Sequence, residues 1–153
     1  MAKRMQPEPK PTSEVFSLKT PYLSSGRITK LVSKAEGLWI HTKINAEGGE
    51  NGLHCHTQED HAFIVLEGEG TFYDEDGNET TLKPHQGIMI PKGAYYRYLN
   101  TGKGNLMVVR VGGGIKTDSV ASRIDPEGKP ILTDSEENKH IEGVPIPGKF
   151  FGE

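Results

Sequence analysis

Short alternating segments, separated by turn signals, fill most of this chain and constrain its fold more than any other feature. We identify eight or nine such segments between residues 26 and 111. In residues 38–45, apolar side chains recur at every second position, which is the period of a β-strand. Residues 74–78 contain Asp-Gly, a strong signal for a hairpin turn. No stretch in this span repeats apolar residues at helical spacing, so the sequence predicts an all-β sandwich or barrel.

Less regular segments flank this span at both ends. Residues 1–25 begin with a polar, proline-rich stretch and predict an N-terminal arm. Residues 26–114 predict one β-barrel domain, because a chain of 153 residues is long enough for one domain. Residues 115–153 cannot form a core of their own and predict a C-terminal arm, which is either flexible or packed on the barrel or on a partner subunit. A short helix could form near residues 133–139, with acidic side chains in its first turn.

Composition narrows the class of protein. The formal charge of -3 and the pI of about 6.1 give no electrostatic footprint for nucleic acid or for a basic membrane surface. No apolar run approaches the length of about 20 residues that a membrane helix needs. Cys55 is the only cysteine, so no intrachain disulfide can form. We therefore expect a soluble cytoplasmic protein with neither nucleic-acid nor membrane partners.

Three of the six histidines fall between residues 54 and 61. His54 and His56 are two positions apart, so on an extended strand both imidazoles point to one face. His61 begins the next predicted strand, and a small barrel could bring all three around one ion. Neutral imidazoles suit Zn, Fe, Cu and Ni and, less well, Mn. The alternative is a barrel that keeps these histidines as hydrogen-bonded polar lining without a metal.

These residues resemble the motifs of a known family, the cupins, which are small β-barrels of the double-stranded jelly-roll type. Two motifs carry the resemblance, which covers roughly residues 30–112. The first is represented by Gly48 or Gly49, His54-Cys55-His56, His61 and Gly68. The second is represented by Pro91-Lys92-Gly93, Tyr96 and Asn100, with His85 at its leading glycine position. The resemblance implies a double-stranded β-helix (jelly-roll) barrel with polar N-terminal and C-terminal arms.

Two positions depart from the motifs. His61 stands where cupins usually have glutamate, and Tyr96 stands where they usually have histidine. The resemblance therefore implies a metal site formed by His54, His56 and His61, with Tyr96 as a fourth ligand or a catalytic neighbour. Tyr96 has three interpretations: a phenolate ligand, a protonated hydroxyl that acts as general acid or base, or a packed aromatic ring.

The residues around this site allow more than one interpretation. Glu59 and Asp60 could orient a ligating imidazole, although a solvated charge pair is the simpler account. For His41 and Arg110 we favour the surface. If Arg110 points inward instead, its guanidinium could bind an anionic substrate. Phe63 shares the face of the third histidine and is expected to line the cavity.

The predicted function is that of a metal-dependent enzyme acting on a small molecule, with an anionic substrate favoured by the charge of the ion. The resemblance favours a dioxygenase-like oxidoreductase with a mononuclear three-histidine site and one divalent transition metal, Fe(II) before Zn, Mn, Ni or Cu. The alternatives are a metal-dependent lyase or isomerase and a non-catalytic small-molecule-binding cupin. The resemblance also implies a homodimer that pairs through sheet edges and terminal arms.

Overall fold

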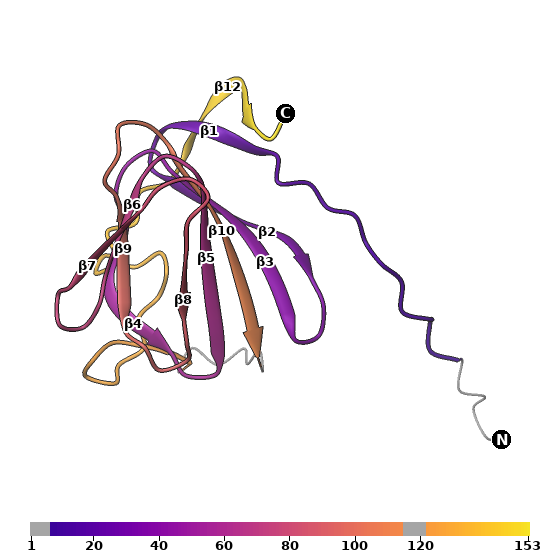
Figure 1. Cartoon of the computed structure of the whole chain (residues 1–153), viewed down its shortest axis with the longest axis horizontal. Helices are drawn as coiled ribbons and strands as arrows, with labels where there is room; N and C mark the ends of the chain where they lie inside the picture. The colour runs from indigo at the N-terminus through magenta and orange to yellow at the C-terminus, as the bar shows by residue number, and fades with distance from the viewer. Residues whose placement is uncertain (1–6, 115–121) are drawn as a thin grey trace.

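Two five-stranded antiparallel sheets form the barrel in the computed structural model, which describes residues 7–114 and 122–153 (Figure 1). A third, two-stranded sheet joins segments near the two ends of the chain. The strands are β1 (Thr20–Ser25), β2 (Arg27–Lys34), β3 (Leu38–Asn45), β4 (Gly49–His56), β5 (Glu59–Glu67), β6 (Gly70–Tyr73), β7 (Glu79–Leu82), β8 (Gly87–Ile90), β9 (Tyr96–Asn100), β10 (Leu106–Gly114), β11 (Arg123–Ile124) and β12 (Val144–Phe151). The prediction of an all-β jelly-roll barrel is confirmed.

The order of strands places neighbouring segments of the chain in opposite sheets. One sheet runs β2-β3-β10-β5-β8 and the other runs β11-β4-β9-β6-β7. The chain crosses from one sheet to the other between β3 and β4, and it crosses back between β4 and β5. Only Thr57 and Gln58 separate β4 from β5. The predicted histidine strand and the strand after it therefore approach each other from the two sheets at one end of the barrel.

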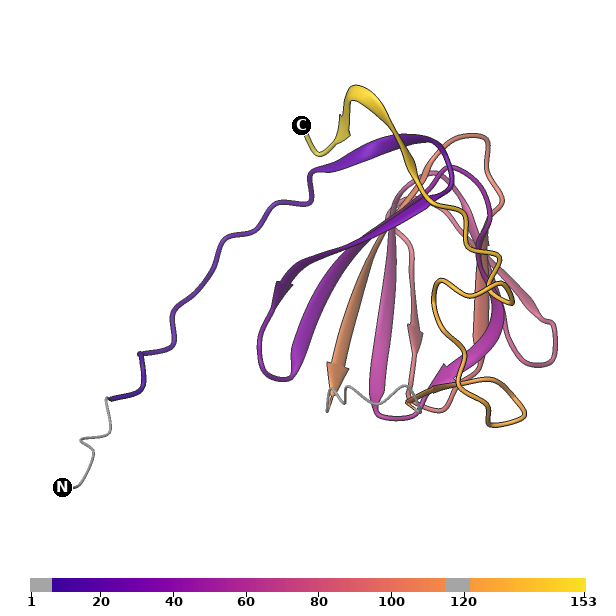
Figure 2. The same cartoon turned by 180° about the vertical axis from the view of Figure 1, so that it is seen from behind.

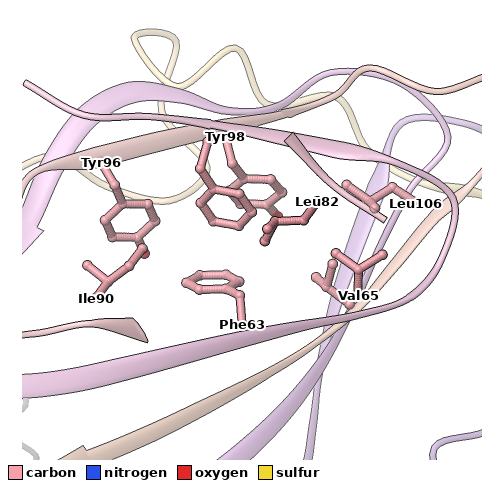
Figure 3. Close-up of a cluster of buried hydrophobic side chains, with 9 residues drawn as sticks. Phe63, Val65, Leu82, Ile90, Tyr96, Tyr98 and Leu106 are labelled. Carbon is pink, nitrogen blue, oxygen red and sulfur yellow. The ribbon is translucent and has the colours of Figure 1, made fainter. Parts of the chain in front are cut away.

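An aromatic cluster fills the space between the sheets (Figure 3). The ring of Phe63 on β5 lies across from Tyr98 on β9, with 5.6 Å between their centroids. Aromatic pairs at this spacing add to the stability gained by burying apolar area. Ile90 on β8 joins the cluster, whereas its neighbour Met89 is 67% exposed. The strand alternation therefore predicts the inward direction of Phe63 correctly.

Segments near the two ends of the chain cover part of the outer face of the first sheet. β1 pairs with β12, and Leu23 of β1 packs in a buried cluster with Ile44 and Met107. Figure 2 shows the C-terminal segment, coloured orange to yellow, following the second sheet before it reaches β1. The described part of the predicted C-terminal arm, residues 122–153, thus packs on the barrel of its own chain.

The predicted helix over residues 133–139 is wrong, because the structure has turns there. Asn138 explains the difference. Its side-chain oxygen accepts a hydrogen bond from the backbone N–H of Gly52 at 2.8 Å, and its amide donates to the carbonyl of Thr133 at 2.7 Å. Asparagine side chains that bond to the backbone in this way compete with helix formation. In the described part of the chain, no helix is long and apolar enough to cross a membrane.

Candidate metal centre

The three histidines near the β4–β5 connection lie together inside the barrel. His54 and His56 project from β4, and His61 projects from β5. The ring centroids of His54 and His56 are 5.3 Å apart, and those of His56 and His61 are 4.1 Å apart. Cys55 lies between the two β4 histidines and is buried outside this cluster, opposite Ile124 of β11. The period of the strand therefore brings His54 and His56 to one inner face, whereas the donor atoms close enough together to hold an ion come from His56, Glu59 and His61 and not from His54.

Glu59 brings a carboxylate into the cluster. Its Oε1 atom lies 3.1 Å from Nδ1 of His56 and 3.2 Å from Nε2 of His61. One donor atom from each of the three residues lies within 4.8 Å of the other two. Donors bound to one ion at about 2.1 Å stand roughly 3.0–3.4 Å apart at tetrahedral or octahedral angles. The interpretation of Glu59 as part of a solvated charge pair is wrong, whereas Asp60 is exposed and accepts a hydrogen bond from the N–H of Lys92 at 2.8 Å.

The hydrogen bonding of these side chains is incomplete, which fits a metal ion. Both ring nitrogens of His61 and Nδ1 of His56 are buried without a hydrogen-bond partner. Despite its short distances, the Glu59 oxygen therefore does not meet either imidazole in hydrogen-bonding geometry. A buried polar atom without a partner costs about 1–3 kcal/mol. A coordinated ion would satisfy Nδ1 of His56 and one of the two ring nitrogens of His61.

Burial sets the protonation states that a metal site needs. Burial lowers the pKa of His61 to about 4 and also lowers that of His56. Burial alone would raise the pKa of Glu59, but the neighbouring His56 and His61 outweigh it and hold that pKa below its ordinary value. Near neutral pH the cluster thus consists of two neutral imidazoles and one carboxylate, all of them able to donate lone pairs to an ion.

The ring of His54 is held through Nδ1, while its other nitrogen, Nε2, lies beside Glu50. Its Nδ1 lies 2.8 Å from the carbonyl oxygen of Gly52, and this contact fixes the tautomer with the proton on Nδ1. Nε2 is then deprotonated and has no hydrogen-bond partner, although it lies 3.8 Å from a carboxylate oxygen of Glu50. Burial lowers the pKa of His54 to about 3, so the ring stays neutral. Its role as a further ligand remains a prediction.

Tyr96 lies on β9, directly opposite His54 in the sheet. The two ring centroids are 4.4 Å apart, and the Tyr96 hydroxyl lies 3.5 Å from Nε2 of His56. Burial raises the pKa of the Tyr96 phenol well above its ordinary value, so the hydroxyl keeps its proton. Of the three interpretations of Tyr96, this geometry favours the protonated hydroxyl, which lies at hydrogen-bonding distance from His56. Ligation and catalysis by Tyr96 remain predictions.

A buried ion pair lies behind His54. Nζ of Lys43 is 2.7 Å from Oε1 of Glu50, and both side chains are almost fully inaccessible to solvent. Nη2 of Arg123, from β11, lies 3.9 Å from the same oxygen. Burial would raise the pKa of Glu50, but the charges of Lys43 and Arg123 hold it well below its ordinary value. The sequence alone did not predict this ion pair. The available signal was Lys43, a charged residue within the alternating strand of residues 38–45.

The surface interpretation of His41 and Arg110 is wrong. Arg110 on β10 is paired with Phe63 of the core, and its Nη2 lies 3.2 Å from Nδ1 of His41. Its Nε atom is buried without a hydrogen-bond partner. The sequence was misleading because both faces of these strands are covered: the inner face by the opposite sheet and the outer face, near Ile44, by the β1–β12 ribbon. Apolar alternation therefore no longer distinguishes inside from outside.

Comparison with known proteins identifies the family. Residues 41–112 match the family model described as a cupin domain. Residues 41–112 therefore form a cupin domain, and the two-sheet barrel agrees with this match. Among curated proteins, none matches the sequence.

Solved structures support the fold at low sequence identity. A protein with a double-stranded β-helix domain from Klebsiella pneumoniae is 20% identical, with a TM-score of 0.54, and the match covers 60% of this chain and 79% of that one. KdgF from Halomonas sp. is 18% identical, with a TM-score of 0.55 and coverage of 61% and 83%. A sugar phosphate isomerase from Silicibacter pomeroyi is 18% identical, with a TM-score of 0.56 and coverage of 71% and 82%. These likenesses concern the fold alone.

Proposed function

We propose that this cupin is a metal-dependent enzyme of the mononuclear non-haem dioxygenase type. The observation that carries the proposal is the convergence of His56, Glu59 and His61 at one end of the barrel interior. Two histidines and one carboxylate around open positions are typical of non-haem Fe(II) oxygenases. Glu59 thus joins the predicted donor set of His54, His56, His61 and Tyr96.

The chain's own residues supply an environment suited to that chemistry. A bound Fe(II) ion would supply the redox and Lewis-acid chemistry. The protonated Tyr96 hydroxyl lies 3.5 Å from His56 and can hold a proton at an oxygen beside the cluster. The aromatic cluster around Phe63 restricts water on the inner side. The inward Arg110 places a guanidinium in the barrel interior, which favours an anionic substrate.

A metal-dependent isomerase or lyase is the second candidate. The observation that favours it is the buried, protonated hydroxyl of Tyr96 beside the donor set, because such reactions need a group that moves a proton while an ion holds an oxyanion. The likeness to a sugar phosphate isomerase agrees with this candidate only in fold.

Oxygen consumption tests the choice between the two. The chain should be stripped with EDTA, loaded with Fe(II) or Zn(II), and assayed with catechols, thiols and diketones in an oxygen electrode. We expect oxygen uptake in the Fe(II)-loaded protein and none in the Zn(II)-loaded protein. The control His85→Asn removes an exposed imidazole elsewhere and should leave the rate unchanged. Tyr96→Phe should lower the rate about 100-fold or more if the reaction uses the phenolic proton. Bound Fe(II) without uptake on any substrate would favour the isomerase or lyase. A purified chain that binds no metal would indicate a non-catalytic binding protein.

We further propose that the protein forms a homodimer through its N-terminal arm. Residues 7–17 are exposed, with Val15 99% and Phe16 42% exposed, and they meet the barrel where Glu14 accepts a hydrogen bond from the Ser33 hydroxyl of β2 at 3.3 Å (Figure 1). β2 is the outer strand of its sheet and offers unpaired backbone groups. We expect light scattering to give a dimer for the full chain and a monomer after removal of residues 1–17. Full-length Val15→Asp/Phe16→Asp should also be monomeric, and an unchanged mass in both variants would contradict the proposal.

A further inference from the structure

The barrel is open along one side, where the two sheets end. β7 and β8 are the outer strands of their sheets, so no ladder of hydrogen bonds closes the seam between them. A cavity of about 210 Å³ lies in this seam, and we call it the seam pocket. Its apolar lining comes mainly from Phe72, Ile88, Ile90 and Tyr96. An apolar cavity of about 150 Å³ can hold benzene, so this one has room for an aromatic ring with a few further atoms.

The seam pocket adjoins the metal centre. Ile90 pairs directly with His61 across the β5–β8 ladder. Tyr96, on the other side, places its hydroxyl 3.5 Å from Nε2 of His56. Two side chains that line the pocket are therefore immediate neighbours of two histidines in the candidate donor set. Tyr96 therefore lies between the seam pocket and the candidate metal centre.

The charges around the pocket indicate which kind of ligand it can bind. Asp74 lies at its rim, but its two carboxylate oxygens already accept hydrogen bonds from the backbone of Asp76 and from the backbone and side chain of Asn78. That carboxylate is engaged in stabilising the β6–β7 turn. Lysine, arginine and histidine are absent from the described residues that line the pocket. An uncharged apolar group fits there, whereas the guanidinium that suits an anionic group belongs to Arg110 in the barrel interior.

We propose that the seam pocket binds the aromatic or branched apolar end of the substrate, with its polar end directed past Tyr96 toward His56, Glu59 and His61. The pocket is thus a specificity-determining site for a small molecule with one ring or a comparable apolar group. Because it assumes a reaction at the cluster, this inference rests on the proposed function.

Binding of indole to the metal-free protein tests the pocket separately from the metal. Backbone amide NMR in EDTA should show saturable shifts at Met89 and Ala94, on either side of the pocket. Ala94→Trp and Thr80→Trp add bulk at exposed positions that line opposite parts of the pocket, and each should weaken indole binding at least 10-fold. Lys103→Trp, which adds the same side chain on a distant exposed loop, should leave it unchanged. Absence of saturable shifts, or equal affinity in all three variants, would overturn the proposal.

A second measurement tests the link to the metal centre. Mn(II) bound at the donor set should broaden the NMR signals of bound indole, and Glu59→Ala should remove this broadening while indole affinity stays the same. Bound indole that Mn(II) does not broaden would show that the pocket is separate from the cluster and overturn the substrate assignment. If Mn(II) does not bind, the proposed function fails, and the metal-free titration alone decides whether the pocket takes an apolar ligand.

Discussion

Replacing His61 by alanine is expected to lower the affinity for a divalent metal by more than about 100-fold, since partners that merely support a ligand are worth about 10–100-fold. His61 is buried, and neither of its ring nitrogens has another hydrogen-bond partner. The substitution removes one of three converging donors and leaves His56 and Glu59 unable to enclose an ion. Titration with Co(II), followed through its visible spectrum, and competition with Zn(II) measure the loss.

The matched control is again His85→Asn, because His85 is exposed and its backbone has a positive φ of 74°, which asparagine tolerates. Metal should also protect the folded state: an ion present at 100 times its Kd adds about 2.7 kcal/mol to the free energy of unfolding. We expect this protection in the wild type and in His85→Asn and its loss in His61→Ala. Equal metal affinity in His61→Ala and the wild type would rule out the donor set.

The second large effect concerns stability. Glu50→Ala should lower the free energy of unfolding by about 3–5 kcal/mol, because removing one member of a buried ion pair leaves the other without compensation. Lys43 is only 2% exposed and lies 2.7 Å from Glu50, so after the substitution its ammonium must either stay charged in the core or lose its proton. Urea unfolding of the metal-free protein near pH 6 measures the change.

The double variant Lys43→Met/Glu50→Leu separates loss of the pair from loss of packing. Replacing both members by apolar side chains of similar size is often neutral or stabilising. We therefore expect the double variant to be closer to the wild type than Glu50→Ala is. If the free energy of unfolding of Glu50→Ala lies within about 1 kcal/mol of the wild-type value, Lys43 and Glu50 do not depend on each other in the way proposed.

Local signals in the sequence were sufficient for the barrel. The alternation of residues 38–45 gives β3 with the predicted bounds, and the Asp-Gly turn near Gly77 joins β6 to β7. The period of two also places His54 and His56 on one inner face. These features depend only on residues close together in the sequence and on the geometry of a strand, so a single sequence is enough to predict them.

Features that depend on distant segments could not be predicted in the same way. The inward direction of Arg110 follows from its pairing with Phe63 of the core, which joins two strands far apart in the sequence. Arg123 approaches Glu50 only because β11 docks beside β4. The Glu59 carboxylate could point toward solvent or toward His56, and the sequence does not distinguish the two directions. The fold does, because it places the carboxylate beside His56.

The shortest strand of the barrel has a consequence for the histidine strand beside it. Without β11, β4 would be the outer strand of its sheet, because β11 alone flanks it on that side among the described residues. An uncovered edge offers its N–H and C=O groups to any other extended chain. Arg123 and Ile124 pair with His56 and Cys55 and so occupy that edge where the donor residues begin. Two residues of the C-terminal segment thus protect this edge of the histidine strand from pairing with other extended chains.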